Sequence, residues 1–294
     1  MPSSLNDAHC HFFSTPFFTA LGGDALKTLA WDAPGSADEL ADRWVEELDR
    51  HRVARAAIIA SVPGDSESVA AAVERHPSRL VGFFMVDPTQ PTAAASTAEA
   101  LDRDLLRTIC LFPAMHRYSL HDERARRVLD VASAHHAAVF VHFGVLSVGV
   151  RKKLGLASPF DMRYSNPIDL HAIALAYADV PFIVPHFGAG FFREALMIAD
   201  LCPNVHLDTS SSNSWIKYHP GLTLIGVFRQ ALAVVGSDRL LFGTDSSFFP
   251  RGWVKDVYDQ QSAALDELNV GADVREKIFG GNFERLFPVR ADYS

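Results

Sequence analysis

The sequence predicts an α/β protein folded as a (β/α)8 TIM barrel, and three observations support that prediction. Eight short apolar segments resemble strands, and most are separated by segments with helical periodicity. Most strand segments lack clean polar–apolar alternation, which is typical of strands buried on both faces of a parallel sheet. Polar residues gather at the carboxyl ends of these segments, where a barrel carries its active site. The alternative is an open doubly wound sheet, and the placement of the polar residues favours the barrel.

The expected strands are Leu5–His11, Ala56–Ser61, Leu80–Asp87, Thr108–Phe112, Ala138–Phe143, Pro181–His186, Asn204–Thr209 and Leu240–Thr244. Amphipathic stripes and capping residues predict the helices between them. Asp65 and Thr92 are expected to cap two helices, and Ser119 is expected to open another. The remaining helices are expected at Glu39–Arg50, Ile168–Ala178, Gly190–Leu201, Leu222–Val235 and Val254–Leu268.

Length and composition restrict the classes of protein. The chain has 294 residues, with 27 Lys and Arg against 35 Asp and Glu, a net charge of −8. A barrel runs to about 250 residues as one domain, so one domain over residues 1–294 is expected. Net acidity argues against a nucleic-acid partner, which needs a dense basic face. The three cysteines have no ligand spacing, which excludes a disulfide framework and a zinc knuckle and fits a reducing cytoplasm.

One segment is long and uncharged enough to be tested as a membrane span. Val131–Val150 contains no Asp, Glu, Lys or Arg, but it contains His135, His136 and His142. Three imidazoles facing lipid would be costly, so the segment is interpreted as a helix end followed by a strand. The N-terminal residues lack the basic flank of a secretory signal. We therefore expect a cytoplasmic protein without a membrane partner.

The residues that carry chemistry lie at strand ends. His9 and His11 alternate in the first strand, so both side chains point into the predicted barrel, while Cys10 points to the helix layer. Such a pair can bind one divalent ion through two imidazoles. His142 and His186 end the fifth and sixth strands, and Asp245 follows the eighth. Five metal- or proton-handling groups at four strand ends predict a metal site.

These residues belong to five motifs that resemble a known family. The motifs are Asp7-Ala8-His9-Cys10-His11, VHFG around His142, PHFGAG around His186, FGTD ending at Asp245, and GNFERLF. They resemble the amidohydrolase superfamily, and within it the amidohydrolase-related branch that includes aminocarboxymuconate semialdehyde decarboxylase and small lactonases. The resemblance runs from Asp7 to Phe287. It implies a barrel of the metal-dependent hydrolase type with a bound zinc or similar ion.

The resemblance also assigns roles to the strand-end residues. It makes His9, His11, His142 and Asp245 the metal ligands and His186 the general acid/base, with Asp245 also able to handle protons. Three neutral imidazoles and one carboxylate leave the ion positively charged with open positions. The ion can lower the pKa of bound water toward ~7 or polarise a carbonyl. In the alternative site, His186 is the fourth ligand and Asp245 is the general base.

The lysines predict how many metal ions are bound. Members of the family with two ions commonly bridge them with a carboxylated lysine at the end of the fourth strand. That strand is RTICLFP here, and none of the six lysines ends a predicted strand. One divalent ion is therefore expected, with Zn²⁺ as the first choice and Mn²⁺ as the second.

Several loop residues are candidates for binding the substrate. His116 and Tyr118 follow the fourth strand and could line the pocket, and Arg163, Lys217 or Arg251 could bind a substrate carboxylate. Otherwise each is an ordinary polar or solvated loop residue. A cluster of aromatic residues suited to a flat or cyclic substrate follows the first and eighth strands: Phe12, Phe13, Phe17, Phe18, Phe248, Phe249 and Trp253. His206 and Asp208 share one face of the seventh strand and are candidates for supporting the site.

The leading function is a metal-dependent hydrolase of a small organic carbonyl compound, a lactone or a related carboxylated substrate. The main alternative is a non-oxidative decarboxylase of an aromatic or muconate-like acid that uses the same metal site. A non-enzymatic metal-binding barrel is the third class, and the complete acid/base set argues against it. The partner is a small-molecule substrate, and a homodimer is the family-level expectation.

Overall fold

The computed structural model describes residues 4–211 and 214–289, without the side chains of residues 249 and 250. Its nine strands are ordered β8-β7-β6-β5-β4-β3-β2-β1-β9 in one sheet, and all neighbouring strands are parallel. This is the α/β, TIM-barrel-like architecture that the sequence predicts. The strands are β1 (Asn6–Phe12), β2 (Arg55–Ala60), β3 (Leu80–Val86), β4 (Leu106–Leu111), β5 (Ala138–Val141), β6 (Phe182–Val184), β7 (Val205–Asp208), β8 (Leu240–Leu241) and β9 (Ser246–Ser247).

The eighth predicted strand differs most from expectation: of Leu240–Thr244 only Leu240–Leu241 forms β8, and a further short strand, β9, follows at Ser246–Ser247. β8 pairs with β7, and β9 pairs with β1. The link between them also contacts β1: the Ala8 amide donates to the Phe242 carbonyl at 2.8 Å, and the Asp245 amide donates to the His9 carbonyl at 3.0 Å. Asp245 has a φ of 59°, which interrupts the extended backbone. The segment therefore joins the two ends of the sheet and turns Asp245 out of the strand path.

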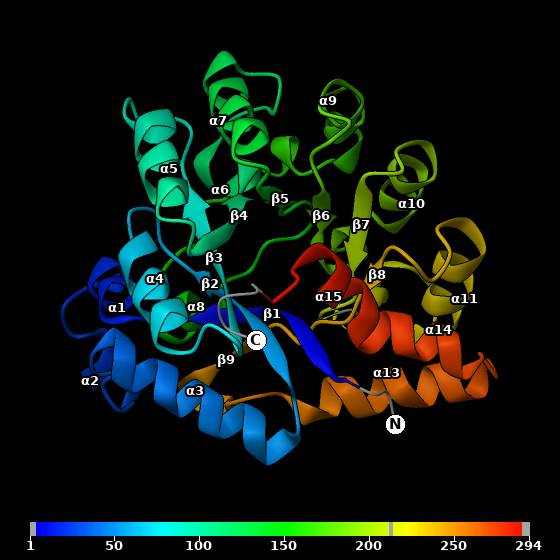
Figure 1. Ribbon diagram of the computed structural model, residues 1–294, viewed down its shortest axis with the longest axis horizontal. Coiled ribbons are helices and arrows are strands. Elements are labelled where there is room, and N and C mark those ends of the chain that lie inside the picture. Colours follow the sequence, from blue (N-terminus) through cyan, green and yellow to red (C-terminus); the bar gives the residue numbers. More distant parts are fainter. Residues whose placement is uncertain (1–3, 212–213, 290–294) are drawn as a thin grey trace.

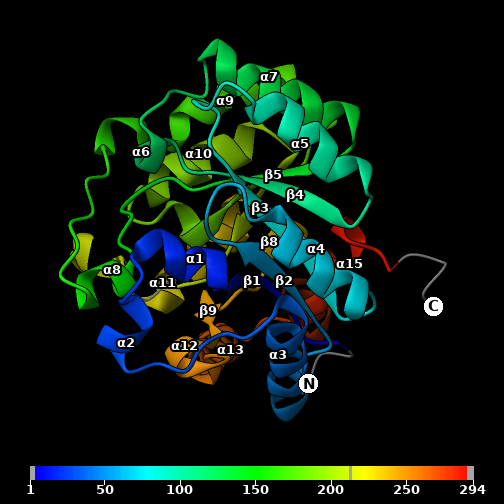
Figure 2. The same cartoon turned by 90° about the vertical axis from the view of Figure 1, so that its left-hand side faces the viewer.

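Helices surround the strands in the view of Figure 1. α1, α2 and α8 lie at one end of the barrel, and α15 lies at the opposite end (Figure 2). The α-helices are α1 (Thr15–Leu21), α2 (Ala25–Leu29), α3 (Ala37–His51), α4 (Ser66–Arg75), α5 (Ala93–Asp102), α6 (Pro113–His116), α7 (Glu123–Ala134), α8 (Gly149–Lys153), α9 (His171–Ala176), α10 (Phe192–Leu201), α11 (Leu224–Val234), α12 (Phe248–Arg251), α13 (Lys255–Glu267), α14 (Ala272–Glu276) and α15 (Asn282–Leu286). Short helical turns are η1 (Met162–Tyr164), η2 (Pro167–Leu170), η3 (Pro185–Gly188), η4 (Ile216–Tyr218) and η5 (Lys277–Gly281).

The helix starts show which capping predictions hold. Asp65 and Thr92 occupy the expected cap positions, but neither side chain accepts a hydrogen bond from a backbone amide of its helix. Asp65 instead accepts hydrogen bonds from Ser14 and Ser68. The helix expected to open at Ser119 begins at Glu123, because Asp122 accepts from the Arg124 amide and caps it.

The apolar core has two layers separated by the sheet. Consecutive strand residues point to opposite faces of the sheet, so Ile58 and Ile59 are both buried but belong to different clusters. One cluster fills the space between strands and helices, and the other fills the barrel interior. Phe283 and Phe287, from α15 and the residue after it, pack into the interior cluster. The interior is thus closed at one end by aromatic side chains, which leaves the opposite end for polar chemistry. Among the described residues no helix combines the length and apolarity needed to cross a bilayer.

Candidate active site

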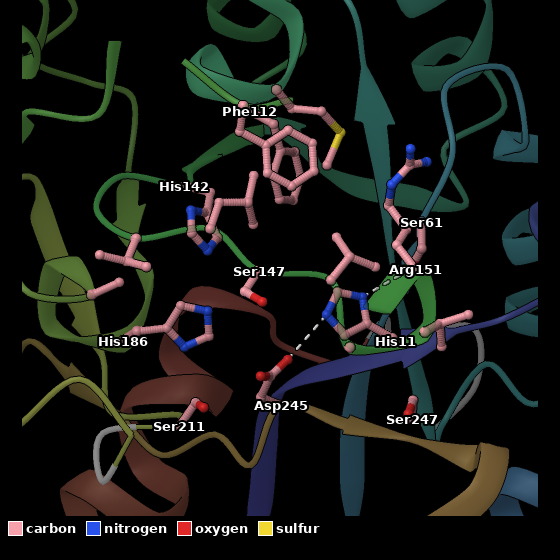
Figure 3. Close-up of a pocket in the computed structure, with 18 of the residues that line it drawn as sticks. His11, Ser61, Phe112, His142, Ser147, Arg151, His186, Ser211, Asp245 and Ser247 are labelled. Carbon is pink, nitrogen blue, oxygen red and sulfur yellow. Dashed lines mark hydrogen bonds and ion pairs between the residues drawn. The ribbon is translucent and has the colours of Figure 1, made fainter. Parts of the chain in front are cut away.

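The five predicted strand-end residues line one cavity of about 790 Å³. His9 and His11 come from β1, and His142 follows β5. His186 lies in η3 after β6, and Asp245 lies between β8 and β9. Figure 3 shows His11, His142, His186 and Asp245 around this space. The convergence predicted from the strand order is therefore present in the fold.

β1 carries the two histidines through an irregularity in its pairing. The β1–β2 register shifts between Asp7 and Cys10, so the intervening residues face a single partner position. His9, within the shift, and His11, beyond it, both face the cavity, and Cys10 packs in the cluster between strands and helices. This confirms the predicted orientation of all three side chains.

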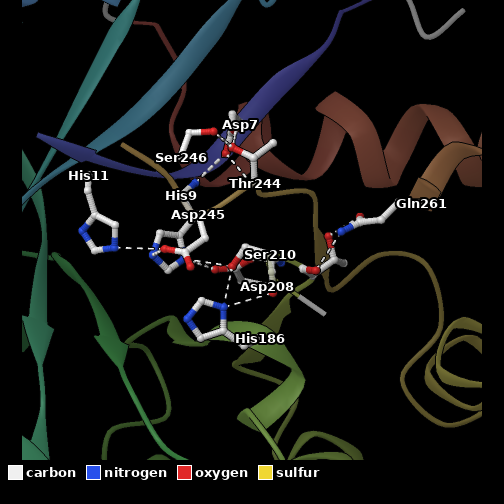
Figure 4. A network of polar contacts seen from close by, with 11 residues as sticks. Asp7, His9, His11, His186, Asp208, Ser210, Thr244, Asp245, Ser246 and Gln261 are labelled. Atoms are coloured by element: carbon white, nitrogen blue, oxygen red, sulfur yellow. Dashed lines mark hydrogen bonds and ion pairs between the residues drawn. The ribbon is translucent and has the colours of Figure 1, made fainter. Parts of the chain in front are cut away.

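Asp7 begins the motif but lies outside the cavity lining. Its Oδ2 accepts hydrogen bonds from Thr244 Oγ1 at 2.6 Å and from Trp253 Nε1 at 2.7 Å. Its Oδ1 accepts from the His9 amide at 2.9 Å. Complete burial raises the pKa of Asp7 to about 6 despite these donors. Asp7 therefore ties β1 to the segment that carries Asp245 (Figure 4).

Asp245 lies at the centre of the cluster. Its Oδ1 is 3.0 Å from His11 Nε2 and 3.6 Å from His9 Nε2. One potential ligand atom from each of His9, His186 and Asp245 lies within 4.8 Å of the others. His142 extends the group, since its ring centroid is 5.1 Å from that of His186. Within the described chain, these spacings place His186 in the same group of potential ligands as His9 and Asp245.

Backbone strain is concentrated at the same residues. His186 and Asp245 have φ values of 57° and 59°, in the left-handed region that non-glycine residues rarely adopt. Phe187 and Ala189 continue the left-handed turn after β6. Such strain costs on the order of 1–3 kcal/mol per residue and persists where surrounding packing imposes it, often at functional sites.

Each of three imidazoles has a partner on its Nδ1 atom. His9 Nδ1 is 2.6 Å from Asp208 Oδ2, and His11 Nδ1 is 2.8 Å from Ser61 Oγ. His186 Nδ1 is 3.0 Å from the Ser210 carbonyl oxygen. A carboxylate and a carbonyl only accept, so Nδ1 of His9 and of His186 carries the proton. Ser61 donates its own proton to the Ile59 carbonyl at 3.0 Å, so it accepts from His11 Nδ1 as well.

This assignment leaves the Nε2 lone pairs to face the cavity. The lone pairs of His9 and His11 are then directed at the Asp245 carboxylate, which is repulsive unless something positive lies between them. A proton on Nε2 would relieve this repulsion for one imidazole, whereas a bound cation would relieve it for His9, His11 and Asp245 together. Imidazole nitrogens and a carboxylate oxygen are the donors that Zn²⁺ and related ions take. The residues present therefore fit a divalent metal ion.

At His142 and Asp245 the electrostatics favour the protonation states that a metal needs, whereas at His9 they favour the protonated imidazole. Burial lowers the pKa of His142 well below its usual value and also lowers that of His186, so both are neutral. Burial disfavours charge on His9 too, but Asp208 and Asp245 outweigh it and raise the pKa of His9. Burial opposes ionisation of Asp245, yet the His11 hydrogen bond and nearby imidazoles lower its pKa.

His142 differs from the other histidines in its surroundings. Its ring stacks on Phe112 at a centroid distance of 5.4 Å. Among the described residues its buried Nδ1 has no hydrogen-bond partner. A buried, neutral and unpartnered imidazole at a cluster of ligands is expected to bind something that the protein itself does not supply.

The rest of the cavity wall is apolar and cationic. Phe13 and Phe17 are stacked at a centroid distance of 4.0 Å and line it. The charged lining residues apart from Asp245 and the histidines are all basic: Arg151, Lys153, Lys217 and Arg251. The segment after β5 supplies Arg151 and Lys153 from α8, whereas the residue predicted from this segment is Arg163.

The predicted substrate residues have different positions in the structure. Arg251 lines the cavity, but His116, Tyr118 and Arg163 do not. His116 and Tyr118 are turned into the protein, and Tyr118 is buried. Arg163 is exposed and paired with Asp161 at 2.5 Å. Of the aromatic candidates, Phe13 and Phe17 reach the cavity, Phe12 and Phe18 pack in the core, and the Phe249 side chain lies outside the described part.

Comparison with known proteins gives one match to a family model and many to solved structures. The model described as amidohydrolase matches residues 7–289. Protein fluG of Emericella nidulans is 34% identical over 86 residues, and this chain spans about a tenth of its length. A probable 2-pyrone-4,6-dicarboxylic acid hydrolase from Acinetobacter baumannii superposes with a TM-score of 0.65 at 14% identity, covering 97% of this chain and 99% of that one.

Two further structures contain metal ions. An amidohydrolase from Burkholderia multivorans with bound zinc has a TM-score of 0.64 at 17% identity, covering 98% of this chain and all of that one. The 5-carboxyvanillate decarboxylase LigW2 from Novosphingobium aromaticivorans, as a D314N mutant with bound manganese, has a TM-score of 0.60 at 14% identity. It covers 97% of this chain and 96% of that one. At these identities the likeness concerns the fold.

Proposed function

The chain belongs to the amidohydrolase family, and from this membership we propose that it is a metal-dependent hydrolase of a small carbonyl compound that carries a carboxylate. The observation that carries the proposal is the set of imidazole Nε2 atoms around Asp245, with His11 at 3.0 Å and His9 at 3.6 Å. Lone pairs held against a carboxylate by Asp208 and Ser61 indicate a cation site built into the barrel.

The proposed ligands are His9, His11, His142 and Asp245. One ion is expected, Zn²⁺ in the first place and Mn²⁺ in the second, as in a barrel of the metal-dependent hydrolase type. When bound, such an ion polarises a substrate oxygen or lowers the pKa of a water. The neutral state of His142 and the ionised state of Asp245 are the forms that bind metal.

The protein's own residues handle charge and protons around the substrate. His186 presents an unprotonated Nε2 toward the cavity, so it can accept a proton and return it. Lys217 and Arg251 can bind an anionic group, and the protein as a whole is acidic with a net charge of −8. A basic lining in an acidic protein favours an anionic substrate. The stacked pair Phe13 and Phe17 suits a flat or cyclic body.

A decarboxylase is the second candidate. A 5-carboxyvanillate decarboxylase shares the fold over 97% of this chain. The same imidazole and carboxylate cluster could hold a substrate carboxylate beside an adjacent oxygen, and His186 could protonate the carbon that loses carbon dioxide. The two reactions therefore differ in product and not in the residues they use.

One assay separates the two functions. The metal-loaded protein is incubated with 2-pyrone-4,6-dicarboxylate and, separately, with 5-carboxyvanillate, and both ring opening and released carbon dioxide are measured. Ring opening without carbon dioxide supports the hydrolase, and carbon dioxide release supports the decarboxylase. Activity that survives complete metal removal by a chelator would contradict the proposed role of the ion in either reaction.

A further inference from the structure

Ser210, the second residue after β7, contacts two of the site histidines at once. Its hydroxyl oxygen is 2.9 Å from His186 Nδ1 and 3.0 Å from His9 Nδ1, and its carbonyl oxygen is 3.0 Å from His186 Nδ1 (Figure 4). Ser210 is fully buried and does not line the cavity. It therefore contacts the two imidazole rings on the side away from the cavity, where it cannot touch a substrate.

The backbone around Ser210 is held from two sides. Asp208 Oδ1 accepts from the Ser210 amide at 2.6 Å, while the other Asp208 oxygen accepts from His9. Thr209 points the opposite way and is bound by Gln261 of α13, whose amide donates to the Thr209 carbonyl at 2.8 Å. The Thr209 hydroxyl donates back to Gln261 at 2.7 Å. This double contact fixes the position of the Ser210 oxygen atoms relative to the barrel.

There is no spare room around this arrangement. A Cβ placed on Gly243 would lie 2.7 Å from Asp208 Oδ1, 3.0 Å from His9 Cβ and 3.1 Å from Ser210 Cβ. Water therefore has little space to replace a hydroxyl that is removed. The His186 Nδ1 proton is shared between two oxygens of one residue, and the loss of either is expected to loosen the ring.

We propose that Ser210 is a positioning residue that holds His186 with Nδ1 protonated and Nε2 toward the cavity, and that ties this ring to His9. The expected effect of Ser210 on catalysis rests on the acid/base role proposed for His186. The His186 tautomer does not depend on that role, so it can be measured whether or not a substrate is known.

The test compares Ser210→Ala with Ser165→Ala, both labelled with ¹⁵N-histidine and loaded with Zn²⁺. Ser165 is an equally buried serine whose hydroxyl has no hydrogen-bond partner among the described residues, so it is a matched control. Two-bond ¹H–¹⁵N spectra distinguish the ring tautomers, and a His186→Gln variant assigns the signal. Zinc content is measured on the same samples.

In the wild type and in Ser165→Ala we expect a single Nδ1–H tautomer for His186. Ser210→Ala keeps the carbonyl contact and removes the hydroxyl contact, so the His186 ring is held less firmly and its signal should broaden or show a minor second tautomer, while His9 stays Nδ1-protonated through Asp208 and zinc content stays unchanged. A His186 spectrum in Ser210→Ala that matches the wild type would overturn the proposal. So would a wild-type His186 protonated on Nε2, a result that needs no variant to fold.

Kinetics add a second measurement. On 2-pyrone-4,6-dicarboxylate we expect kcat of Ser210→Ala to fall about 3- to 10-fold, the loss of one hydrogen bond, with KM unchanged. An unchanged kcat in a protein that turns over this compound would count against the proposal. Absence of turnover in the wild type would count against the proposed function alone, and the ring spectra would still decide the role of Ser210.

Discussion

At the scale of single residues, the state of each imidazole follows from the group that faces its Nδ1 atom. Asp208 and the Ser210 carbonyl bind the Nδ1 atoms of His9 and His186 and so leave their Nε2 atoms to face the cavity. His142 has no such group among the described residues, and burial keeps it neutral. The chemistry of the site is therefore set partly by residues that never reach the cavity.

The ligand role of His142 can be tested by removing its ring. We expect His142→Ala to lose metal occupancy and turnover together, because one ligand is missing, while the far-UV circular dichroism stays native. His116→Ala removes another imidazole, one outside the cavity lining whose buried Nδ1 makes no hydrogen bond within the described residues, and it should keep its metal. If His142→Ala retains full metal and full rate, the ligand assignment is wrong.

His186 can be tested by separating metal content from rate. If it is the acid/base, His186→Asn keeps the ion while turnover drops roughly 10²- to 10⁴-fold. Elemental analysis and turnover are measured on one preparation. His186 lies within the same tight cluster as His9 and Asp245. Loss of the ion together with activity would therefore make His186 a ligand and leave Asp245 as the base.

At the scale of elements, β7 carries two inward-facing polar residues with different tasks. Asp208, at its carboxyl end, supports His9. His206, two residues earlier on the same face, is buried and has no partner for Nδ1 among the described residues. Of the pair proposed to support the site, only Asp208 touches it. His206 is an uncharged residue of the barrel wall.

His206 predicts a pH dependence of stability. Burial first, and the charges of Arg285 and Arg239, lower its pKa to about 4. The unfolded chain binds its proton near pH 6.5 and the folded chain only near pH 4, so stability present above pH 6.5 is lost as the pH falls between these values. His206→Leu should flatten this loss by on the order of 2–3 kcal/mol in denaturant melts of the metal-free protein.

A packing variant of the same strand separates this titration from general destabilisation. Val205→Ala removes buried apolar contacts without removing an ionisable group, so it should lower the free energy of unfolding by a similar amount at every pH. Equal slopes for His206→Leu and the wild type between pH 4 and 6.5 would contradict the assignment of the pH dependence to His206.

At the scale of the whole molecule, three strands (β1, β5 and β6) and the segment between β8 and β9 deliver one ligand set to one end of the barrel. No lysine lies at the end of β4 to bridge a second ion. The purified protein should therefore carry about one divalent ion per chain by elemental analysis. Refilling a metal-free sample should raise its Tm, because an ion that binds only the folded state stabilises it. Two tightly bound ions, or none after mild purification, would contradict this stoichiometry.

Local pattern was sufficient for the order of elements and the ligand candidates. Buried strands are continuous apolar runs, and their carboxyl ends meet at one end of a barrel, so His9, His11, His142, His186 and Asp245 could be grouped before their positions were known. Element ends were less predictable. β8 ends at Leu241, because the following backbone bonds to Ile278 and to β1, contacts between segments far apart in the sequence.

The sequence by itself determined the amidohydrolase family, the parallel α/β architecture and the residues able to hold a metal, because these depend on residue type, order and spacing. The tertiary structure alone decided which atoms face one another. It placed Ser210 and Asp208 behind the imidazoles, brought Arg151 and Lys153 to the cavity, and turned His116 and Tyr118 away from it. These outcomes depend on contacts such as that between Ser210 and His9, which are 201 residues apart, and no local pattern encodes such a pairing.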